Sequence, residues 1–402
     1  MKRAVISIII LYFVQGVLHN LGHPVTPAFV RSLEIPDKMF GFFYATMSLG
    51  LMVGSPIWGV LADRGKKRTV MVLGLLIYSF GQFGFGYAGN MYWMIFFRFI
   101  SGFGVAASMT LFVSHMIEVS EPEKRAKHLA WLAAALALGA SVGYALGGII
   151  STNPTIVNFL HTDDLRVVFL IQASLNIIHA FNVFILIRED DVINKATKKP
   201  TFIESFKNIG KINTNLLLFL ISLTFISISI TNLSKYLDVY FDDLGYSSGD
   251  IGNFVFVTGI VSIVTSILIV PLITRLHKNL LIMMIAQIVS IIVVLIVFRA
   301  NNFLLIVYTV YMIYVVAKAI YQPLEQNFIA DNANKGFYSS IMGVRQSFYS
   351  IGMIIGPLIG GFLYELKPIN VFNFSALMVF VGLVLMIVIY IRIKKNSDLQ
   401  NS

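Results

Sequence analysis

Long apolar runs separated by short polar stretches fill the chain from its first residues to its last. A helix needs roughly 20 apolar residues to cross a hydrocarbon layer of about 30 Å. Backbone groups in lipid must be hydrogen-bonded within their own segment, so such runs form helices. The alternating segments of about 10 residues that build membrane β-barrels are missing from the sequence. The pattern predicts an all-α integral membrane protein with twelve transmembrane helices, at about residues 5–27, 40–61, 69–89, 92–117, 129–150, 166–187, 214–237, 250–273, 279–299, 302–327, 339–364 and 370–392.

One polar connection is much longer than the others. It runs from Arg188 to about Asn213 and separates six apolar runs from six, as a linker between two bundles does. We therefore expect an N-terminal six-helix bundle at residues 1–187, a linker at 188–213 and a C-terminal six-helix bundle at 214–402. The first run is not followed by a small-residue cleavage site, so we interpret it as a retained helix and not as a signal peptide.

Composition and charge agree with a membrane protein. Of the 402 residues, 57% are hydrophobic and 12% are charged, whereas a soluble domain has about 25% charged residues. The chain has no cysteine, which excludes disulfides and thiolate metal sites. The formal net charge of +10 would fit a nucleic-acid partner, but most basic residues fall on one side of the predicted helices. This positive-inside bias predicts that both termini are cytoplasmic, and it accounts for the charge without nucleic acid.

The fifth and eleventh runs share one spacing of glycines. Glycines four residues apart lie on one helix face and let a second helix approach closely. Packing alone explains such a pattern in a single run, but its presence at matching places in both halves indicates an internal repeat of the kind found in transporters. The glycines are Gly139, Gly143, Gly147 and Gly148 in the fifth run, and Gly352, Gly356, Gly360 and Gly361 in the eleventh.

The connection between the second and third runs reads G-V-L-A-D-R-G-K-K-R over residues 59–68. Together with the two six-run halves, it resembles the major facilitator superfamily, whose signature loop reads G-x-L-A-D-R followed by a glycine and a basic pair. The glycine, Gly65, stands one residue early here. The resemblance covers the whole chain and implies a transporter that exposes a central site to each side of the membrane in turn. The loop residues that keep the family spacing are Gly59, Asp63, Arg64, Lys67 and Arg68.

Asp63 ends a helix at the membrane face, where a carboxylate can meet the positive N-terminal end of another helix. In the family that partner is the start of the eleventh helix, here at about residues 337–341. The resemblance implies that the contact forms when the cytoplasmic sides of the halves are closed, and that it stabilises the outward-facing state. The alternative is a solvated basic loop that only sets the topology.

Arg98 stands about two turns inside the fourth run. Residues 98–102 read R-F-I-S-G, which resembles the R-x-x-x-G pattern that is prominent in proton-coupled members of the family. A lone arginine in an apolar helix is costly and should face a cavity or a partner. Alternatively, its long side chain extends to the outer interface.

The eleventh run contains G-x-x-x-G-P-x-x-G-G over residues 352–361, including Pro357. This resembles the signature of the antiporters, or exporters, of the superfamily. The family copy stands in the fifth helix, where this chain has Tyr144 in place of the proline. The resemblance favours export.

Candidate proton-coupling groups are few. Burial raises the pKa of a carboxyl group toward the working range, so that it can bind and release a proton. Each carboxylate has a simpler interpretation. Glu325 pairs with Lys318, seven residues earlier, or with loop charges. Asp238 pairs with Lys235 at the interface, and Glu118 belongs to a solvated helix end. The candidates are Arg98, Glu325, Asp238 and Glu118.

Polar residues inside the runs are candidates for a substrate cavity. In the first run Gln15, His19 and His23 recur every fourth residue and share one helix face. The histidines either relay protons, form hydrogen bonds within the bundle, or bind a metal, for which no third ligand is evident. The cavity candidates are Gln15, His19, His23, Asn176, Asn232 and Lys318.

These features predict a secondary transporter, resembling the twelve-helix drug:proton antiporter branch, that exports amphipathic small molecules. An uptake symporter for a metabolite or sugar and a lipid or glycolipid flippase remain alternatives on the same scaffold. The acids and histidines are scattered, so we expect neither an enzyme nor a metal site, and no cofactor. The expected partners are a small-molecule substrate, H⁺ and the lipid bilayer, and the expected state is a monomer in the cell membrane of a bacterium.

Overall fold

The computed structural model describes residues 2–35, 39–152, 155, 164–187, 212–246, 248–333 and 338–401. The described chain is helical, as predicted, and eleven of its segments are long and apolar enough to cross a membrane. One of these, Phe42–Tyr87, spans 46 residues and holds two helices, α3 (Met39–Leu61) and α4 (Lys67–Tyr87). Counting these two separately agrees with the predicted twelve.

The helices group into two compact units. Unit 1 is formed by residues 1–209 and 333–347, and unit 2 by residues 210–332 and 348–402. Helix α16 (Tyr338–Leu366) therefore begins in unit 1 and continues in unit 2. All but the last two residues of the predicted linker, 188–213, lie outside the described residues.

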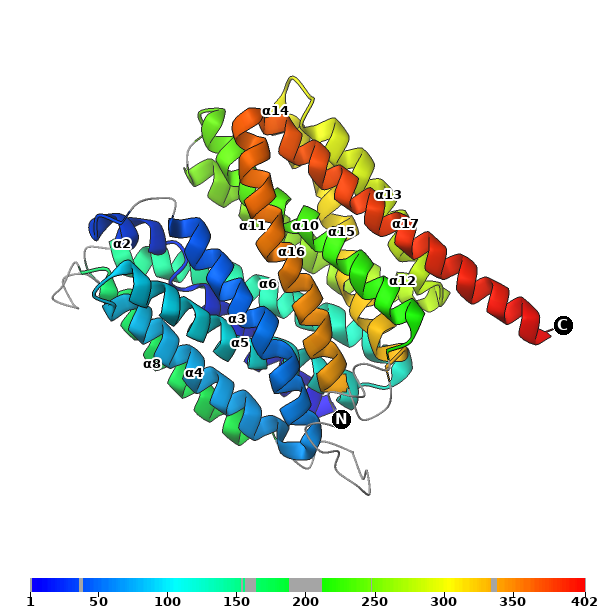
Figure 1. Cartoon of the computed structure of the whole chain (residues 1–402), viewed down its shortest axis with the longest axis horizontal. Helices are drawn as coiled ribbons and strands as arrows, with labels where there is room; N and C mark the ends of the chain where they lie inside the picture. The colour runs from blue at the N-terminus through cyan, green and yellow to red at the C-terminus, as the bar shows by residue number, and fades with distance from the viewer. Residues whose placement is uncertain are drawn as a thin grey trace. The chain divides into compact units, whose positions relative to one another are not determined.

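Six long helices make up the described part of unit 1. They are α1 (Lys2–Asn20), α3, α4, α5 (Met91–Val119), α6 (Pro122–Thr152) and α8 (Arg166–Leu186). Helix α5 packs on α3 and α4, α1 packs on α6 and α8, and α4 packs on α8 (Figure 1). The first helix is shorter than the predicted run 5–27, because turns at residues 21–25 separate it from the short helix α2 (Thr26–Ser32).

Local sequence explains how several of these helices begin and end. The side chain of Asn90 accepts hydrogen bonds from the N–H groups of Tyr92 and Trp93, both at 3.1 Å, and so caps α5. Between α3 and α4 the chain forms a π-helical turn, Ala62–Lys66. Gly65 within it has φ 87°, a left-handed conformation that glycine adopts at little cost. The glycine that stands one residue early in the sequence is thus the residue that reverses the chain.

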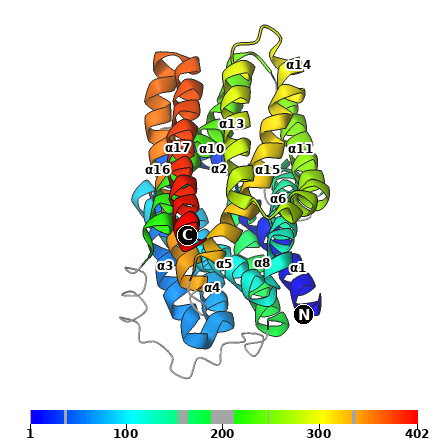
Figure 2. The same cartoon turned by 90° about the vertical axis from the view of Figure 1, so that its right-hand side faces the viewer.

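Unit 2 contains α10 (Thr214–Asp243), α11 (Ser248–Val264), α13 (Asn279–Val297), α15 (Val310–Asp331), the rest of α16 and α17 (Pro368–Asn401). Helix α13 packs on α15 and α17, α15 on α11, and α10 on α17 (Figure 2). Helix α11 passes through a π-helical stretch, Thr265–Ile269, into α12 (Val270–Ile273). Pro271 lies just after this stretch and has no N–H to donate, which explains the local widening.

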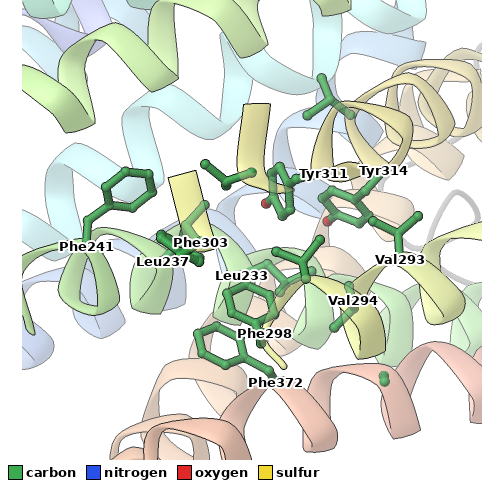
Figure 3. Close-up of a cluster of buried hydrophobic side chains, with 14 of the residues drawn as sticks. Leu233, Leu237, Phe241, Val293, Val294, Phe298, Phe303, Tyr311, Tyr314 and Phe372 are labelled. Carbon is green, nitrogen blue, oxygen red and sulfur yellow. The ribbon is translucent and has the colours of Figure 1, made fainter. Parts of the chain in front are cut away.

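Aromatic side chains hold one end of unit 2 together. Phe298 of the α13 end stacks on Phe372 of α17, with ring centroids 3.4 Å apart. Phe303, which begins the short helix α14 (Phe303–Tyr308), contacts Phe241 of α10 at 5.1 Å. Figure 3 shows these rings with Tyr311 and Tyr314 of α15 in one cluster of buried side chains. The cluster also includes Phe254 of α11 and so joins five spans where the connecting loops are short.

Candidate functional site

The carboxylate of Asp63 lies at the N-terminus of α16, within unit 1. It accepts hydrogen bonds from the backbone N–H groups of Ser339, at 3.1 Å, and Ser340, at 2.8 Å. The N–H groups of a first helical turn have no partner inside the helix, and the helix dipole makes this end positive. The sequence predicts this contact at residues 337–341, and the structure places Asp63 there, although Phe337 lies outside the described residues.

Lys67 lies beneath this contact with its side chain buried, 1% exposed. Its ammonium group donates to Ser114 Oγ at 2.8 Å and forms an ion pair with Glu118 Oε1 at 2.5 Å. Ser114 Oγ in turn lies 2.6 Å from Ser339 Oγ. One connected network therefore links the turn after α3, the end of α5 and the start of α16. We call Asp63, Lys67, Ser114, Glu118, Ser339 and Ser340 the Asp63 network.

The start of α16 also packs tightly on α3. A Cβ atom at Gly59 would overlap the carbonyl oxygen of Ser339, and one at Gly343 would overlap that of Ser55. Ser347 Oγ donates to the carbonyl oxygen of Met52 at 2.5 Å. Glycine is thus required at Gly59 for this close approach.

The two arginines of the loop do not take part in the Asp63 network. Arg64 is exposed. Arg68 lies over the ring of Phe184, with its guanidinium carbon 4.6 Å from the ring centroid. The four charged residues of the motif therefore have three different environments.

The side chain of Arg98 packs inside unit 1. Its side chain is 6% exposed, and its guanidinium carbon lies 3.7 Å from the ring centroid of Phe85. It also donates to Thr26 Oγ1 at 3.3 Å. In the part of the chain that the structure describes, no carboxylate forms an ion pair with Arg98. A desolvated cation–π contact of this kind contributes about 2 kcal/mol, which partly offsets the cost of burial.

The repeated glycines mediate equivalent helix pairs in the two units. In unit 1, Cβ atoms at Gly139 and Gly143 would overlap carbonyl oxygens of α1, and one at Gly147 would overlap that of Leu21 in the turn after α1. A Cβ atom at Gly148 would meet nothing within 4 Å. In unit 2 the same face of α16 lies on α10: Gly352 meets Ser227, Gly356 meets Ile228 and Asn232, and Gly360 and Gly361 meet Tyr236. Tyr236 donates to the carbonyl oxygen of Pro357 at 2.7 Å. Tyr144, which replaces the proline in unit 1, stacks on His23 with centroids 5.8 Å apart.

The remaining coupling candidates lie apart from the Asp63 network. Glu325 is fully buried in α15, beside the buried Gln326 and Asn327. Lys318 lies two turns earlier on α15, about 10 Å of helix rise away. Asp238 lies in α10, but its side chain lies outside what the structure describes.

Two of the four cavity candidates of unit 1 are fully buried, whereas His19 and His23 are partly exposed. Gln15 and Asn176 are 0% exposed. Gln172, which sequence reasoning missed, donates from Nε2 to the carbonyl oxygen of Leu18 at 2.6 Å and thereby joins α8 to α1. In unit 2, Asn232 is also 0% exposed and lies against the glycines of α16.

Sequence reasoning also missed Ser114 and Ser339, and it did not pair Glu118 with Lys67. The available signal was the spacing of Ser114 and Glu118, which are four residues apart and so share one face of α5. Which helix that face meets is a property of the packed bundle and not of the spacing.

Replacing Asp63 by asparagine is expected to reduce transport by roughly tenfold or more while the protein remains folded. Hydrogen bonds to a charged group are worth about 1.5–3 kcal/mol, and 1.4 kcal/mol corresponds to a tenfold change in an equilibrium constant. The amide also turns a donor toward one of the two N–H groups. Initial transport rates, normalised to purified protein, measure the effect. Glu121→Gln is the matched control, since Glu121 is 41% exposed and pairs with the exposed Lys124; equal rates in both variants would contradict the assignment.

Comparison with known proteins identifies the scaffold. The model of the Major Facilitator Superfamily matches residues 6–279 and 217–402. Multidrug resistance protein 2 of Bacillus subtilis is 24% identical over 373 residues, which are 90% of this chain and 88% of that protein. The quinolone resistance protein NorA of Staphylococcus aureus is 24% identical over 366 residues, which are 89% of this chain and 90% of that protein.

Solved structures show the same fold at lower identity. The human organic anion transporter MFSD10 (TETRAN) superposes with a TM-score of 0.74 at 15% identity, covering 96% of this chain and 99% of that chain. The transporter FucP in its outward conformation gives 0.75 at 14% identity, covering 96% and 98%.

Proposed function

Because the chain belongs to the major facilitator superfamily, and is thus a multi-pass transporter of the cell membrane that carries small molecules, we propose that it exports amphipathic compounds in exchange for protons. One observation carries the proposal: relatives named for multidrug and quinolone resistance align with 89–90% of the chain. The complete G-x-x-x-G-P-x-x-G-G pattern in α16 supports export. The transporter would act as a monomer.

In the proposed mechanism two six-helix bundles rock around a central site that opens to each side in turn. The Asp63 network is the cytoplasmic gate of this cycle. Its hydrogen bonds hold the start of α16 on the turn after α3, so they favour the state in which the cytoplasmic side is closed. Breaking them allows that side to open. Because α3 and α16 approach closely at Gly59, these two helices pack in one defined way in the closed state.

The glycine faces of α6 and α16 act as the matching surfaces on which α1 and α10 move in the cycle. The proposed substrate cavity is lined by the polar residues of the spans, namely Gln15, His19, His23, Asn176, Asn232 and Lys318. Glu325 is the proposed carboxyl group that exchanges protons in unit 2, since it is fully buried in a span. Arg98 provides a fixed positive charge inside unit 1. Glu118 is the weaker candidate for coupling, because its carboxylate already pairs with Lys67.

Dye movement in proteoliposomes tests the proposal. With a pH gradient imposed and the membrane potential clamped, ethidium should accumulate on the acidic side in the presence of the wild-type protein. In Glu325→Gln this gradient-driven accumulation should be lost, because an amide does not bind and release a proton. Accumulation on the alkaline side would indicate a symporter. Absence of any movement of ethidium by folded protein would contradict drug export and favour a metabolite or lipid substrate.

A further inference from the structure

Unit 1 contains a row of uncharged polar side chains in its interior. Gln15 of α1 and Gln172, Asn176 and His179 of α8 are each at most 1% exposed. His19 continues the row on α1, one turn from Gln15. Glutamine, asparagine and histidine are seldom buried unless they are hydrogen-bonded. Five of them at helical spacing on two adjacent helices therefore require an explanation.

Contacts between the helices fix the order of the row. Gln172 Nε2 lies 2.6 Å from the carbonyl oxygen of Leu18 and 3.3 Å from that of His19. At the other end, the ring of Phe112 on α5 contacts both His179 of α8, at 6.3 Å, and Tyr12 of α1, at 5.2 Å. Since α1 and α8 pack together, Asn176 lies at the level of Gln15. The row extends for about 10 Å along the helices.

Most polar atoms of this row have no hydrogen-bond partner among the described protein atoms. This holds for both amide atoms of Gln15, Oε1 of Gln172, Oδ1 of Asn176 and both ring nitrogens of His179. A buried polar atom left without a partner costs about 1–3 kcal/mol, so these atoms need a ligand. The set contains both donors and acceptors, and no carboxylate of the described residues contacts it. Such a lining fits water, which needs two to four polar partners at each position.

Both ends of the row reach further titratable groups. Beyond His19, the partly exposed His23 contacts the His19 ring at 5.7 Å. At the opposite end, the buried His115 follows Phe112 by one turn on α5, and its Nδ1 lies 3.9 Å from Glu118 Oε2. The row therefore lies between a partly exposed histidine and the turn of α5 that carries His115, which contacts Glu118 of the Asp63 network. The titratable and charged groups along it are Tyr78 and Arg98 near His19, Tyr12 with Arg345 near His179, and Glu118 with Lys67 near His115.

We propose, on the basis of the proton-coupled export proposed above, that this row holds a file of water molecules and conducts protons through unit 1, with His19, His179 and His115 as relays. A neutral imidazole accepts a proton from a hydronium ion at one nitrogen and releases the proton of its other nitrogen to the next water. The ring is neutral again and has changed tautomer, and a turn of the ring restores it. This path needs no carboxylate in the middle of the spans of unit 1. Four of the seven histidines of the chain lie along it, which are His19, His23, His115 and His179.

One substitution distinguishes the loss of a proton relay from the loss of hydrogen bonds. His179→Gln keeps a donor and an acceptor in the row, but an amide does not pass a proton from one atom to the other. Proteoliposomes with trapped pyranine report the lumenal pH when only an ethidium gradient is imposed. We expect proton movement per ethidium to fall at least about tenfold, in line with the loss of a positioned proton-transfer group. Exchange of ethidium for ethidium at equal pH needs no proton, so it should continue.

His277→Asn is the matched control. It replaces an exposed histidine of unit 2, and asparagine tolerates its positive φ of 53°; it should keep wild-type coupling. If the wild-type protein moves ethidium without protons, the proposed antiport is wrong, and the proposed proton path is wrong as well. If the wild type and His179→Gln move the same number of protons per ethidium, antiport stands and the path alone is wrong.

Hydroxyl-radical footprinting of the wild-type protein tests the water file without any variant. Phe112 and Phe241 are both 0% exposed, but Phe112 contacts His179 and Phe241 lies in the aromatic cluster of unit 2. Radicals formed from water beside a ring oxidise it even when it is buried. Oxidation of Phe112 well above that of Phe241 supports the file of water. Equal protection of the two rings would overturn it.

Discussion

Replacing Glu118 by glutamine is expected to lower the free energy of unfolding by about 3–5 kcal/mol, the usual cost of leaving one member of a buried ion pair alone. Lys67 is 1% exposed, so its ammonium group cannot recover hydration. Ser114 Oγ, at 2.8 Å, would remain as its hydrogen-bond partner. Thermal unfolding of the detergent-purified protein, followed by intrinsic fluorescence, should show a clear fall in melting temperature. Transport should fall with it, because Ser114 also contacts Ser339 of the Asp63 network.

Two further variants make this result interpretable. Replacing both partners by apolar residues of similar size, in Lys67→Met with Glu118→Leu, should recover most of the lost stability, since neither member of the ion pair is then left buried without the other. Lys124→Met removes one partner of the pair with Glu121, whose side chains are 57% and 41% exposed, and should change stability by at most about 1 kcal/mol. A double variant that is less stable than Glu118→Gln would show that Lys67 is not desolvated in the way described.

The second large effect is expected at Gly143 of α6. A Cβ atom there would overlap the carbonyl oxygen of Val17 and lie 2.9 Å from its carbonyl carbon. Because the obstacle is backbone, no change of rotamer relieves it, and α1 and α6 must separate. We expect Gly143→Val to destabilise the protein by about 3 kcal/mol and to abolish most transport.

Gly148 provides the control on the same helix. A Cβ atom there would meet nothing within 4 Å, so Gly148→Val should leave both the melting temperature and the transport rate close to wild type. The comparison separates packing from helix propensity, since both variants make the same change in α6. Equal losses at the two positions would contradict the close approach of α1 and α6 through one glycine face.

Hydropathy and length are sufficient to predict the membrane spans. The run at 279–299 corresponds to α13, Asn279–Val297, because a long apolar run in lipid has no alternative to a helix. Boundaries are less accurate where the sequence contains local breaks. The predicted first run extends to residue 27, whereas the helix α1 ends at Asn20, where polar residues and the turn-forming Gly22 and Pro24 follow. The division into two six-helix bundles remains a prediction. The structure has two compact units, and the start of α16 belongs to unit 1.

Part of the candidate site could be predicted from the sequence, and part could not. The position of Asp63 at the start of α16 follows from a loop motif with a fixed place in its family, so it was predictable. The pair of Lys67 and Glu118 was not, because it depends on the rotation of α4 against α5, which spacing along one helix does not determine. Arg98 left two alternatives open for the same reason, and its contact with the ring of Phe85 is likewise a property of the packed bundle.

The null point of dye flux tests the exchange of dye for protons most directly. With the membrane potential clamped and a fixed gradient of one pH unit across wild-type proteoliposomes, the opposing ethidium gradient is varied until net flux is zero. One pH unit stores about 1.4 kcal/mol per proton, which corresponds to a tenfold concentration ratio. Antiport predicts that flux stops when ethidium is about tenfold more concentrated on the acidic side for each proton exchanged. A null point at equal ethidium concentrations, or one displaced toward the alkaline side, would contradict it.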